Sequence, residues 1–150
     1  MRDAVQRLFD RQPLMATLGA TLARVAESEI EIHLPFQRAH TQHSGALHAG
    51  IVTAIVDSAC GFAAATTLPA GRSVVSVEFK INLLSPAIGD EMRAIGRVIR
   101  AGRTLTVCSG EVWATVGDSR TLVAVMQATM MSVADAAERD TQRTDASAER

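Results

Sequence analysis

HSGALHAGIVTAIVDSACGFAAATT, residues 43 to 67, is the stretch of this 150-residue chain that decides its fold. Its first residues, with two histidines and two glycines, are typical of a turn, and residues 49 to 65 are apolar or small on nearly every face of a helix. A helix on the surface of a globular protein would carry a polar side. The pattern therefore predicts a helix over residues 49–65 that other parts of the chain enclose on several sides.

A single ionisable residue, Asp57, interrupts this apolar segment. An unpaired buried carboxylate costs several kcal/mol, on the order of the whole stability of a small domain. We therefore expect Asp57 to be paired with another group or to be used in chemistry.

The rest of the chain predicts one more helical region and a series of strands. Residues 3–18 show helical spacing at Val5, Leu8, Phe9 and Gln12, and Pro13 leaves open either one interrupted helix or two short ones. Residues 21–34 alternate between apolar and polar and predict a strand with a bend near residues 27–28, followed by a polar loop over residues 36–45.

Four further alternating segments follow the central helix, over residues 73–84, 91–101, 104–116 and 120–133. Short turns join them, so they predict an antiparallel meander. In the first, odd-numbered apolar residues from 75 to 83 share one face, and Ser76, Glu78, Lys80 and Asn82 share the other. The expected fold is α+β, with a curved antiparallel sheet wrapped around the long central helix.

Composition limits the domain count and the classes of partner. Residues 1–133 are expected to form a single domain, and the Ala-rich, charged residues 134–150 a disordered tail. With 15 basic and 16 acidic residues, the net charge of −1 points neither to nucleic acid nor to an anionic membrane. The sequence contains no run of 18 apolar residues, so no membrane span is expected. The N-terminus lacks the apolar core of a signal peptide. Cys60 and Cys108 are expected to be reduced thiols of a cytoplasmic protein.

A helix inside a curved sheet is the plan of the hotdog fold, and residues 43–64 resemble the signature of the phenylacetic-acid-degradation-type (PaaI-like) acyl-CoA thioesterases. That signature is roughly G-x-x-H-G-G, then an apolar run, an Asp and small residues. SVEFKINLLSPA, residues 76–87, and RAGRTLTVC, residues 100–108, are similar to the strands that follow in that family. The resemblance covers about residues 14–133.

The resemblance implies hydrolysis of acyl-CoA without a metal or an organic cofactor. It also implies a homo-oligomer, usually a tetramer of two dimers, with active sites at the dimer interface. Asp57 matches the catalytic carboxylate, Ala49 the residue whose backbone N–H polarises the thioester carbonyl, and His48 the histidine before it. Gln42 falls where relatives carry Asn or Gln, and Ser76 where some carry an assisting Ser. Ala49 replaces the first Gly of the signature, which matters little for a main-chain donor.

The chemistry of thioester hydrolysis fits these residues. A helix N-terminus offers free N–H groups and a positive dipole end, and the small residues Ala49 and Gly50 let a carbonyl approach them. Asp57 lies eight residues after Ala49, about 12 Å along a helix axis at 1.5 Å per residue. One carbonyl cannot meet both groups of one subunit, so a site shared between two subunits related by two-fold symmetry is expected.

Several roles remain open at this point. Asp57 either activates water as a general base or attacks the carbonyl itself to form an anhydride. Gln42 is expected to orient the water, Ser76 to hydrogen-bond Asp57 or that water, and His48 to hold the thioester or the loop.

Basic residues at the rim are expected to receive the anionic nucleotide of coenzyme A. Arg103 is the first candidate, in the turn formed by Gly102, Arg103 and Thr104, and Lys80 is the second. The acyl group is expected to be medium- or long-chain aliphatic, or aromatic.

Two other functions are compatible with the same fold. One is a non-catalytic acyl-CoA-binding module, in which Asp57 would be idle. The other is an acyl-CoA hydratase or dehydratase, which needs a paired His and carboxylate that the matching positions lack. His40, His43 and His48 do not follow a recognised spacing of metal ligands, so no metal site is expected.

Overall fold

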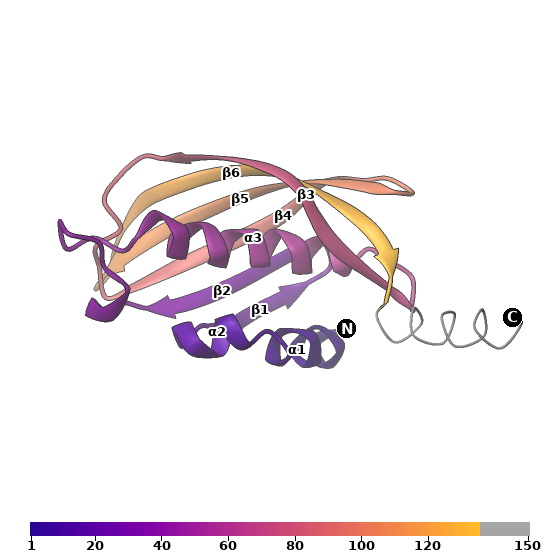
Figure 1. Ribbon diagram of the computed structural model, residues 1–150, viewed down its shortest axis with the longest axis horizontal. Helices are drawn as coiled ribbons and strands as arrows, with labels where there is room; N and C mark the ends of the chain where they lie inside the picture. The colour runs from indigo at the N-terminus through magenta and orange to yellow at the C-terminus, as the bar shows by residue number, and fades with distance from the viewer. Residues whose placement is uncertain (136–150) are drawn as a thin grey trace, which may run out of the picture.

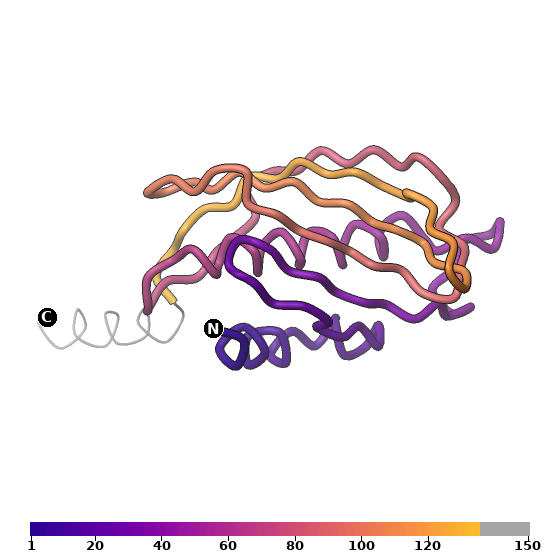
Figure 2. Tube along the Cα trace, turned by 180° about the vertical axis from the view of Figure 1, so that it is seen from behind, coloured from indigo at the N-terminus to yellow at the C-terminus, as the bar shows by residue number. Residues whose placement is uncertain are grey.

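The computed structural model describes residues 1–135, which form a curved antiparallel sheet around one long helix (Figure 1). The six strands are β1 (Thr21–Ala26), β2 (Glu29–Pro35), β3 (Arg72–Leu83), β4 (Glu91–Ala101), β5 (Leu105–Val116) and β6 (Ser119–Ala134). Their order in the sheet is β1-β2-β4-β5-β6-β3, as the view from behind shows (Figure 2). The predicted α+β class and the wrapped helix are confirmed.

The central helix, α3 (Ala49–Ala65), has the predicted limits. It lies against the concave face of the sheet (Figure 1). Its sheet-facing side is fully buried, because apolar residues recur there at helical spacing: Val52, Ile55, Val56, Ala59, Cys60, Ala63 and Ala64.

Two short helices precede the sheet, α1 (Arg2–Asp10) and α2 (Pro13–Leu18). Pro13 begins the second helix, where its missing N–H costs nothing, so the alternative of two short helices is the one that the chain adopts. The rings of Phe9 and Phe62, with centroids 5.8 Å apart, pack α1 against the C-terminal half of α3.

The predicted single bent strand over residues 21–34 is wrong. The chain reverses at Glu27 and Ser28, and β1 pairs antiparallel with β2, with Ala26 opposite Glu29. Ser28, in the turn between the two strands, adopts the left-handed conformation, with φ of 65°. The alternation of apolar and polar residues continues through the turn. Periodicity alone therefore predicts one bent strand where the chain in fact reverses direction.

The predicted four-strand meander is correct only for its last three strands. β4, β5 and β6 are consecutive neighbours, but β3 pairs with β6 along its whole length, and the free side of β4 is taken by β2. The segment from residue 84 to residue 90 crosses from one side of this group to the other. β3 is therefore an edge strand, with one side unpaired.

Two further expectations concern the ends of the chain and the membrane. β6 runs to Ala134, so the predicted tail over residues 134–150 lies outside the described residues except for its first two. Across residues 1–135 no helix combines the length and the apolar character that crossing a bilayer requires.

Candidate active site

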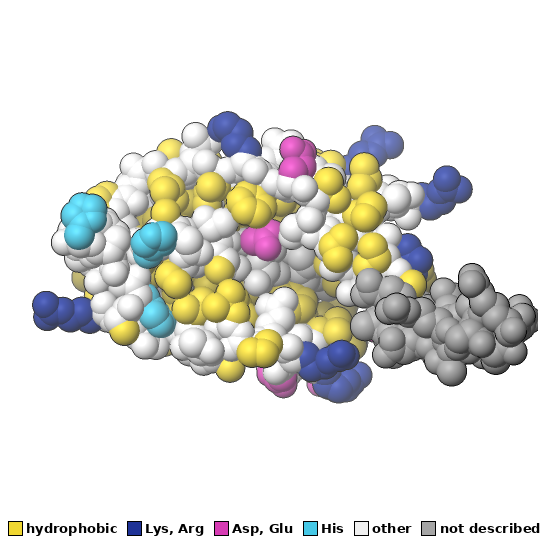
Figure 3. All heavy atoms as spheres, in the orientation of Figure 1, with side chains coloured by type: hydrophobic (Ala, Val, Ile, Leu, Met, Phe, Trp, Pro, Cys, Tyr) yellow, Lys and Arg dark blue, Asp and Glu magenta, His cyan; other side chains and the backbone are white. Residues whose placement is uncertain are grey.

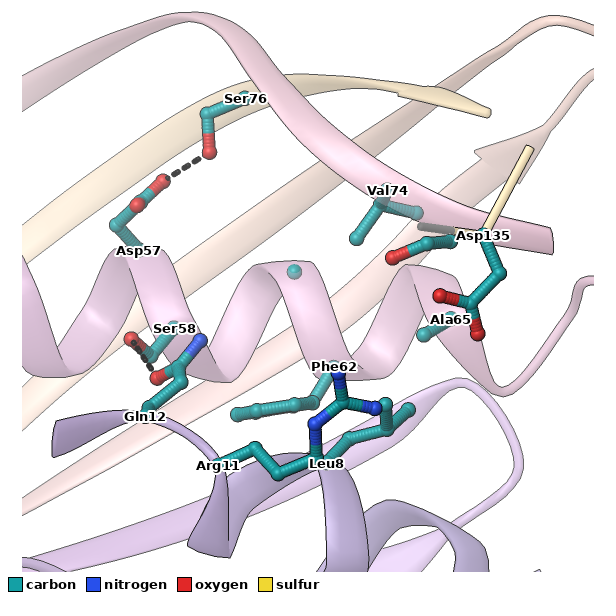
Figure 4. Close-up of a pocket in the computed structure, with 12 residues that line it drawn as sticks. Leu8, Arg11, Gln12, Asp57, Ser58, Phe62, Ala65, Val74, Ser76 and Asp135 are labelled. Atoms are coloured by element: carbon teal, nitrogen blue, oxygen red, sulfur yellow. Dashed lines mark hydrogen bonds between the residues drawn. The ribbon is translucent and has the colours of Figure 1, made fainter. Parts of the chain in front are cut away.

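Asp57 and Ser76 come together in the middle of the molecule, although they lie on α3 and β3 respectively. The Ser76 hydroxyl donates a hydrogen bond of 2.8 Å to Oδ1 of Asp57 (Figure 4). The same hydroxyl lies 3.4 Å from the sulfur of Met130, on the neighbouring strand. Asp57 Oδ2 has no hydrogen-bond partner within residues 1–135, so one carboxylate oxygen is held and the other is available.

A β-bulge places Ser76 on the inner face of the sheet. Ser76 is opposite Met130 and Glu78 is opposite Thr129, so Val77 is an extra residue in β3. Met130 is fully buried, and directly opposed residues share a face, which puts Ser76 on the side of α3. The prediction that Ser76 shares a face with Glu78 is therefore wrong, because strict alternation cannot register an inserted residue.

Asp57 is half-buried and faces an open hollow, whereas the sequence predicted a buried carboxylate. The side of α3 that turns away from the sheet is only partly covered, and hydrophobic side chains gather on this face around a central acidic group (Figure 3). A cavity of about 300 Å³ opens beside Asp57. Its lining comes from α1, the link between α1 and α2, α3 and β3, and includes Leu8, Gln12, Ser58, Phe62 and Ser76 (Figure 4). Ser73, at the start of β3, also belongs to it.

The start of α3 presents one free backbone donor. His48 is the N-cap, and its Nδ1 accepts a hydrogen bond of 2.9 Å from the N–H of Gly50, so the neutral ring carries its proton on Nε2. A side chain at Gly50 would crowd this ring, since a Cβ there would lie 3.1 Å from Nδ1. The N–H of Ala49 has no partner within the described chain. Of Ala49 and Gly50, the two small residues predicted at the helix start, Ala49 is thus the one whose backbone amide is free for a ligand.

Gln42 lies in the loop before α3, beside a second cavity. Its side-chain amide donates to Ser44 Oγ and its Oε1 accepts from the Ser44 N–H at 3.0 Å, which holds the loop in a tight turn. The cavity measures about 690 Å³ and is lined by Gln42, His48, Ala49 and the end of β3, among others. It is largely apolar, with Leu47, Val52, Leu83 and Leu84 in its walls.

The structure therefore assembles the predicted catalytic residues into two separate groups. Asp57 and Ser76 line the first cavity, and Gln42, His48 and Ala49 line the second. No residue is shared between the two linings. This separation within one chain agrees with the distance along the helix axis that the sequence predicts between Ala49 and Asp57.

The residues predicted to hold coenzyme A line neither of these cavities. Lys80 lies opposite the exposed Gln127, on the outer face of the sheet, and donates a 2.6 Å hydrogen bond to Asn82. Gly102, Arg103 and Thr104 are exposed and form the turn between β4 and β5. Their role stays a prediction.

Gln12 and Ser58 belong to the site but were not predicted from the sequence. Ser58 follows Asp57 on α3, and its hydroxyl donates to Gln12 Oε1 at 3.3 Å (Figure 4). The only sequence signal is that Gln12, a polar residue, stands at an otherwise apolar helical spacing with Leu8 and Phe9.

Two thiols lie beneath the site and are unsuited to catalysis. Cys60 and Cys108 are both fully buried and free. Burial raises the pKa of Cys108 to about 11 and raises the pKa of Cys60 further, with contributions from Cys108 and Asp57. Both stay protonated near neutral pH, and the protonated thiol is a poor nucleophile.

No group of three or more His, Cys, Asp or Glu side chains in the described part of the chain is arranged to hold a metal ion.

Known proteins share this fold and this sequence pattern. The model of the thioesterase superfamily matches residues 44–120. The crystal structure of a thioesterase family protein from Silicibacter pomeroyi is 41% identical, with a TM-score of 0.85, over 87% of this chain and 96% of that one. Human acyl-coenzyme A thioesterase 13 is 27% identical over 73% of this chain and 79% of its own length.

The Escherichia coli PaaI protein from the phenylacetic acid degradation operon shares the fold, with a TM-score of 0.76 at 18% identity over 85% of this chain and 88% of that one. These findings confirm the predicted resemblance, the hotdog fold and the class of enzyme. The family model spans more than half of the chain, and a solved member is similar over nearly all of it. The protein therefore belongs to the thioesterase superfamily and is a thioester hydrolase.

Proposed function

We propose that this protein hydrolyses acyl-CoA thioesters and that Asp57 is its catalytic carboxylate. The observation that carries the proposal is the Asp57–Ser76 pair at the wall of a cavity, with one carboxylate oxygen held at 2.8 Å and the other without a partner in the described chain. Medium- or long-chain and aromatic acyl groups are the proposed substrates, with coenzyme A as the leaving group.

The proposed reaction needs only this carboxylate, water and a backbone amide. Asp57 Oδ2 takes a proton from water, whose oxygen attacks the thioester carbon, or attacks that carbon itself to give an anhydride that water then opens. The carbonyl oxygen becomes negative and is stabilised by the N–H of Ala49, a contribution of about 3–4 kcal/mol for one preorganised donor. In the general-base route the C–S bond then breaks, and the proton held by Asp57 passes to the thiolate of coenzyme A. In the anhydride route the C–S bond breaks as the anhydride forms, and the thiolate takes a proton from the water that opens the anhydride, which leaves Asp57 as a free carboxylate.

The two halves of this site are proposed to come from two copies of the chain. β3 is a long edge strand, and its apolar side chains are unusually exposed: Val75 41%, Val77 54%, Phe79 44% and Leu83 52%. A free, apolar strand edge favours pairing with another strand. A two-fold axis beside β3 would set Asp57 of one copy against the start of α3 of the other, twice per dimer.

The remaining parts of the proposal follow the family pattern. Gln42 orients the water, and His48 and Gly50 shape the loop at the carbonyl. Arg103, the turn around it and Lys80 receive the nucleotide of coenzyme A. Two dimers form a tetramer, the reaction uses no cofactor, and the free thiols Cys60 and Cys108 are typical of a cytoplasmic protein.

The first experiment measures thiol release from a panel of acyl-CoAs with wild type, Asp57→Asn and the control Asp118→Asn. Asp118 is exposed in the turn between β5 and β6. Loss of a general base lowers turnover by roughly 10²–10⁴-fold, so Asp57→Asn should lose that much and Asp118→Asn nothing. Unchanged hydrolysis by Asp57→Asn would remove Asp57 from the mechanism.

The amide of Ala49 can be deleted without breaking the helix. Ala49 is the first residue of α3, where proline is well tolerated, and His48 already has the extended conformation that precedes proline, with φ of −60° and ψ of 138°. Ala49→Pro should therefore fold and lose about 10²–10³-fold in kcat.

Mixing the two inactive variants tests whether the site is shared. In a heterodimer of Asp57→Asn and Ala49→Pro, a site between subunits contains one intact pair, so activity returns to up to half of the wild-type value per heterodimer. If each site lay within one chain, the mixture would stay inactive. Dialysis against EDTA, which should leave wild-type turnover unchanged, tests the proposal that no metal is used.

A further inference from the structure

Gln12 and Ser58 form a bridge across the floor of the proposed active site. Gln12 lies between α1 and α2, and Ser58 lies on α3, next to the catalytic carboxylate. Their hydrogen bond of 3.3 Å joins parts of the chain that are 46 residues apart in sequence. Both side chains are only half-buried, so the bridge is at a cavity wall and not in the core.

This bridge stands between two hollows that both reach Asp57. The first, of about 300 Å³, extends from the bridge toward Phe62 and Ser73. The second, of about 350 Å³, extends the other way, under Leu14 and Ala54. Arg11, Gln12, Asp57 and Ser58 belong to both linings, whereas the remaining residues belong to one only.

We infer that Gln12, held by Ser58, is a specificity-determining residue that closes off the second hollow and confines the acyl group to the first. This inference rests on the proposed function. A volume near 300 Å³ is at the lower end of the range for ligand pockets. The enzyme is therefore selective for compact acyl groups, aromatic or of medium length, and a long unbranched chain needs both hollows.

The backbone holds Gln12 in place independently of the bridge. Its N–H donates to Phe9 O at 3.0 Å, and its C=O accepts from Met15 N at 3.1 Å. Gln12 is the N-cap residue of α2, but its side chain makes no capping hydrogen bond. A substitution at this position therefore removes the wall and leaves the helix start unchanged.

The experiment compares kcat/KM for palmitoyl-CoA with kcat/KM for phenylacetyl-CoA and hexanoyl-CoA in four proteins. Gln12→Ala opens the wall, and Gln12→Met keeps its volume without the hydrogen bond. Gln6→Ala is the matched control, since Gln6 lies on α1 and its side chain bonds, among the described residues, only to Asp10. The ratio of kcat/KM for palmitoyl-CoA to kcat/KM for the two compact substrates should rise at least tenfold in Gln12→Ala and stay at the wild-type value in Gln12→Met and Gln6→Ala.

The outcomes separate this inference from the proposed function. An unchanged chain-length profile in Gln12→Ala, with hydrolysis still dependent on Asp57, overturns the role of Gln12 and leaves the thioesterase proposal standing. If the wild type cleaves none of the three substrates, the proposed function fails, and binding of non-hydrolysable thioether analogues of the same chain lengths decides the role of Gln12. A Kd for the palmitoyl analogue that tightens tenfold in Gln12→Ala supports it, and an unchanged Kd or no binding overturns it.

Discussion

The orientation of the Asp57 carboxylate is set by a hydrogen bond from Ser76. That contact depends on Val77, the residue inserted in β3. A hydrogen bond to a charged group is worth about 1.5–3 kcal/mol. With Oδ1 accepting from Ser76, the carboxylate has a defined orientation, and Oδ2 has no hydrogen-bond partner within residues 1–135. Val77 makes this contact by shifting the register of β3, which turns Ser76 toward α3.

Replacing Ser76 with Ala should therefore lower kcat without unfolding the protein. The carboxylate loses its positioning bond but keeps its charge, so the expected fall is about 10–100-fold, less than for Asp57→Asn. Steady-state kinetics on the preferred acyl-CoA measure it. Ser73→Ala is the control, because Ser73 lines the same cavity on the same strand without bonding Asp57. Equal losses in the two variants would contradict a specific role for Ser76.

The buried thiols make stability depend on pH in the alkaline range. Burial raises the pKa of Cys108 from 9.0 to about 11, so the folded state keeps a proton that the unfolded chain releases. A group with a raised folded pKa contributes stability fully below its unfolded pKa and loses that contribution as the pH rises through the folded pKa.

The free energy of unfolding should accordingly fall between about pH 9 and pH 11. Urea melts across this range measure the fall, and Cys108→Ala should show a shallower slope than wild type, although it is less stable at pH 7 because of the cavity it creates. An identical slope in the two proteins would show that Cys108 does not cause the pH dependence.

At the scale of elements, the contact between α3 and the sheet is close enough to exclude a side chain. A Cβ on Gly96, in β4, would lie 2.3 Å from the carbonyl carbon of Ala59 and 2.4 Å from the nitrogen of Cys60, both in the backbone of the helix. Backbone atoms cannot move aside as a flexible side chain can. Gly96 therefore sets how near the helix lies to the sheet, and with it the position of Asp57.

Gly96→Ala should destabilise the fold by about 3 kcal/mol or more, since overpacking against a rigid element costs 1–3 kcal/mol or beyond. Gly61→Ala is the matched control within α3. A Cβ on Gly61 has its nearest neighbour at 3.8 Å, an ordinary contact, and Ala is favoured over Gly in a helix by about 1 kcal/mol. Thermal and urea melts should move in opposite directions for the two variants. A stable Gly96→Ala protein would show that α3 is free to move away from the sheet.

At the scale of the whole molecule, β3 carries a group of exposed apolar side chains on one strand. Val75, Val77, Phe79 and Leu83 lie together on β3, which has one unpaired edge. Val116, by contrast, is an exposed apolar residue at the end of β5, next to a turn. Only the first group offers a continuous strand for another copy to pair with.

Val77→Lys should convert the proposed oligomer to a smaller species and abolish hydrolysis, because each proposed site needs two chains. A charge at the centre of an interface is costly to desolvate, whereas Val116→Lys should leave both mass and activity unchanged. Light scattering coupled to gel filtration gives the mass, and thiol release gives the activity. A fully active monomer of Val77→Lys would contradict a shared site.

The apolar pattern of residues 49–65 predicts α3 with its observed limits, and the lone carboxylate in that pattern identifies Asp57 as the residue to explain. Both follow from the sequence because helical periodicity is a property of one continuous segment. The spacing from Ala49 to Asp57 likewise predicts two separate groups of site residues. The four alternating segments after the helix predict strands with limits that differ by at most one residue from the observed ones.

Only the tertiary structure decides the features that depend on partners distant in sequence. β3 pairs with β6 and not with β4, Val77 forms a bulge that turns Ser76 to Asp57, and Gln12 reaches Ser58 from the other end of the chain. Strand order, register and cavity walls are set by contacts between segments. The sequence pattern of one segment does not predict them, because it is the same whichever other segment it packs against. The sequence by itself determined the helix, its carboxylate and the family of the protein, and the packing of the elements decided what surrounds that carboxylate.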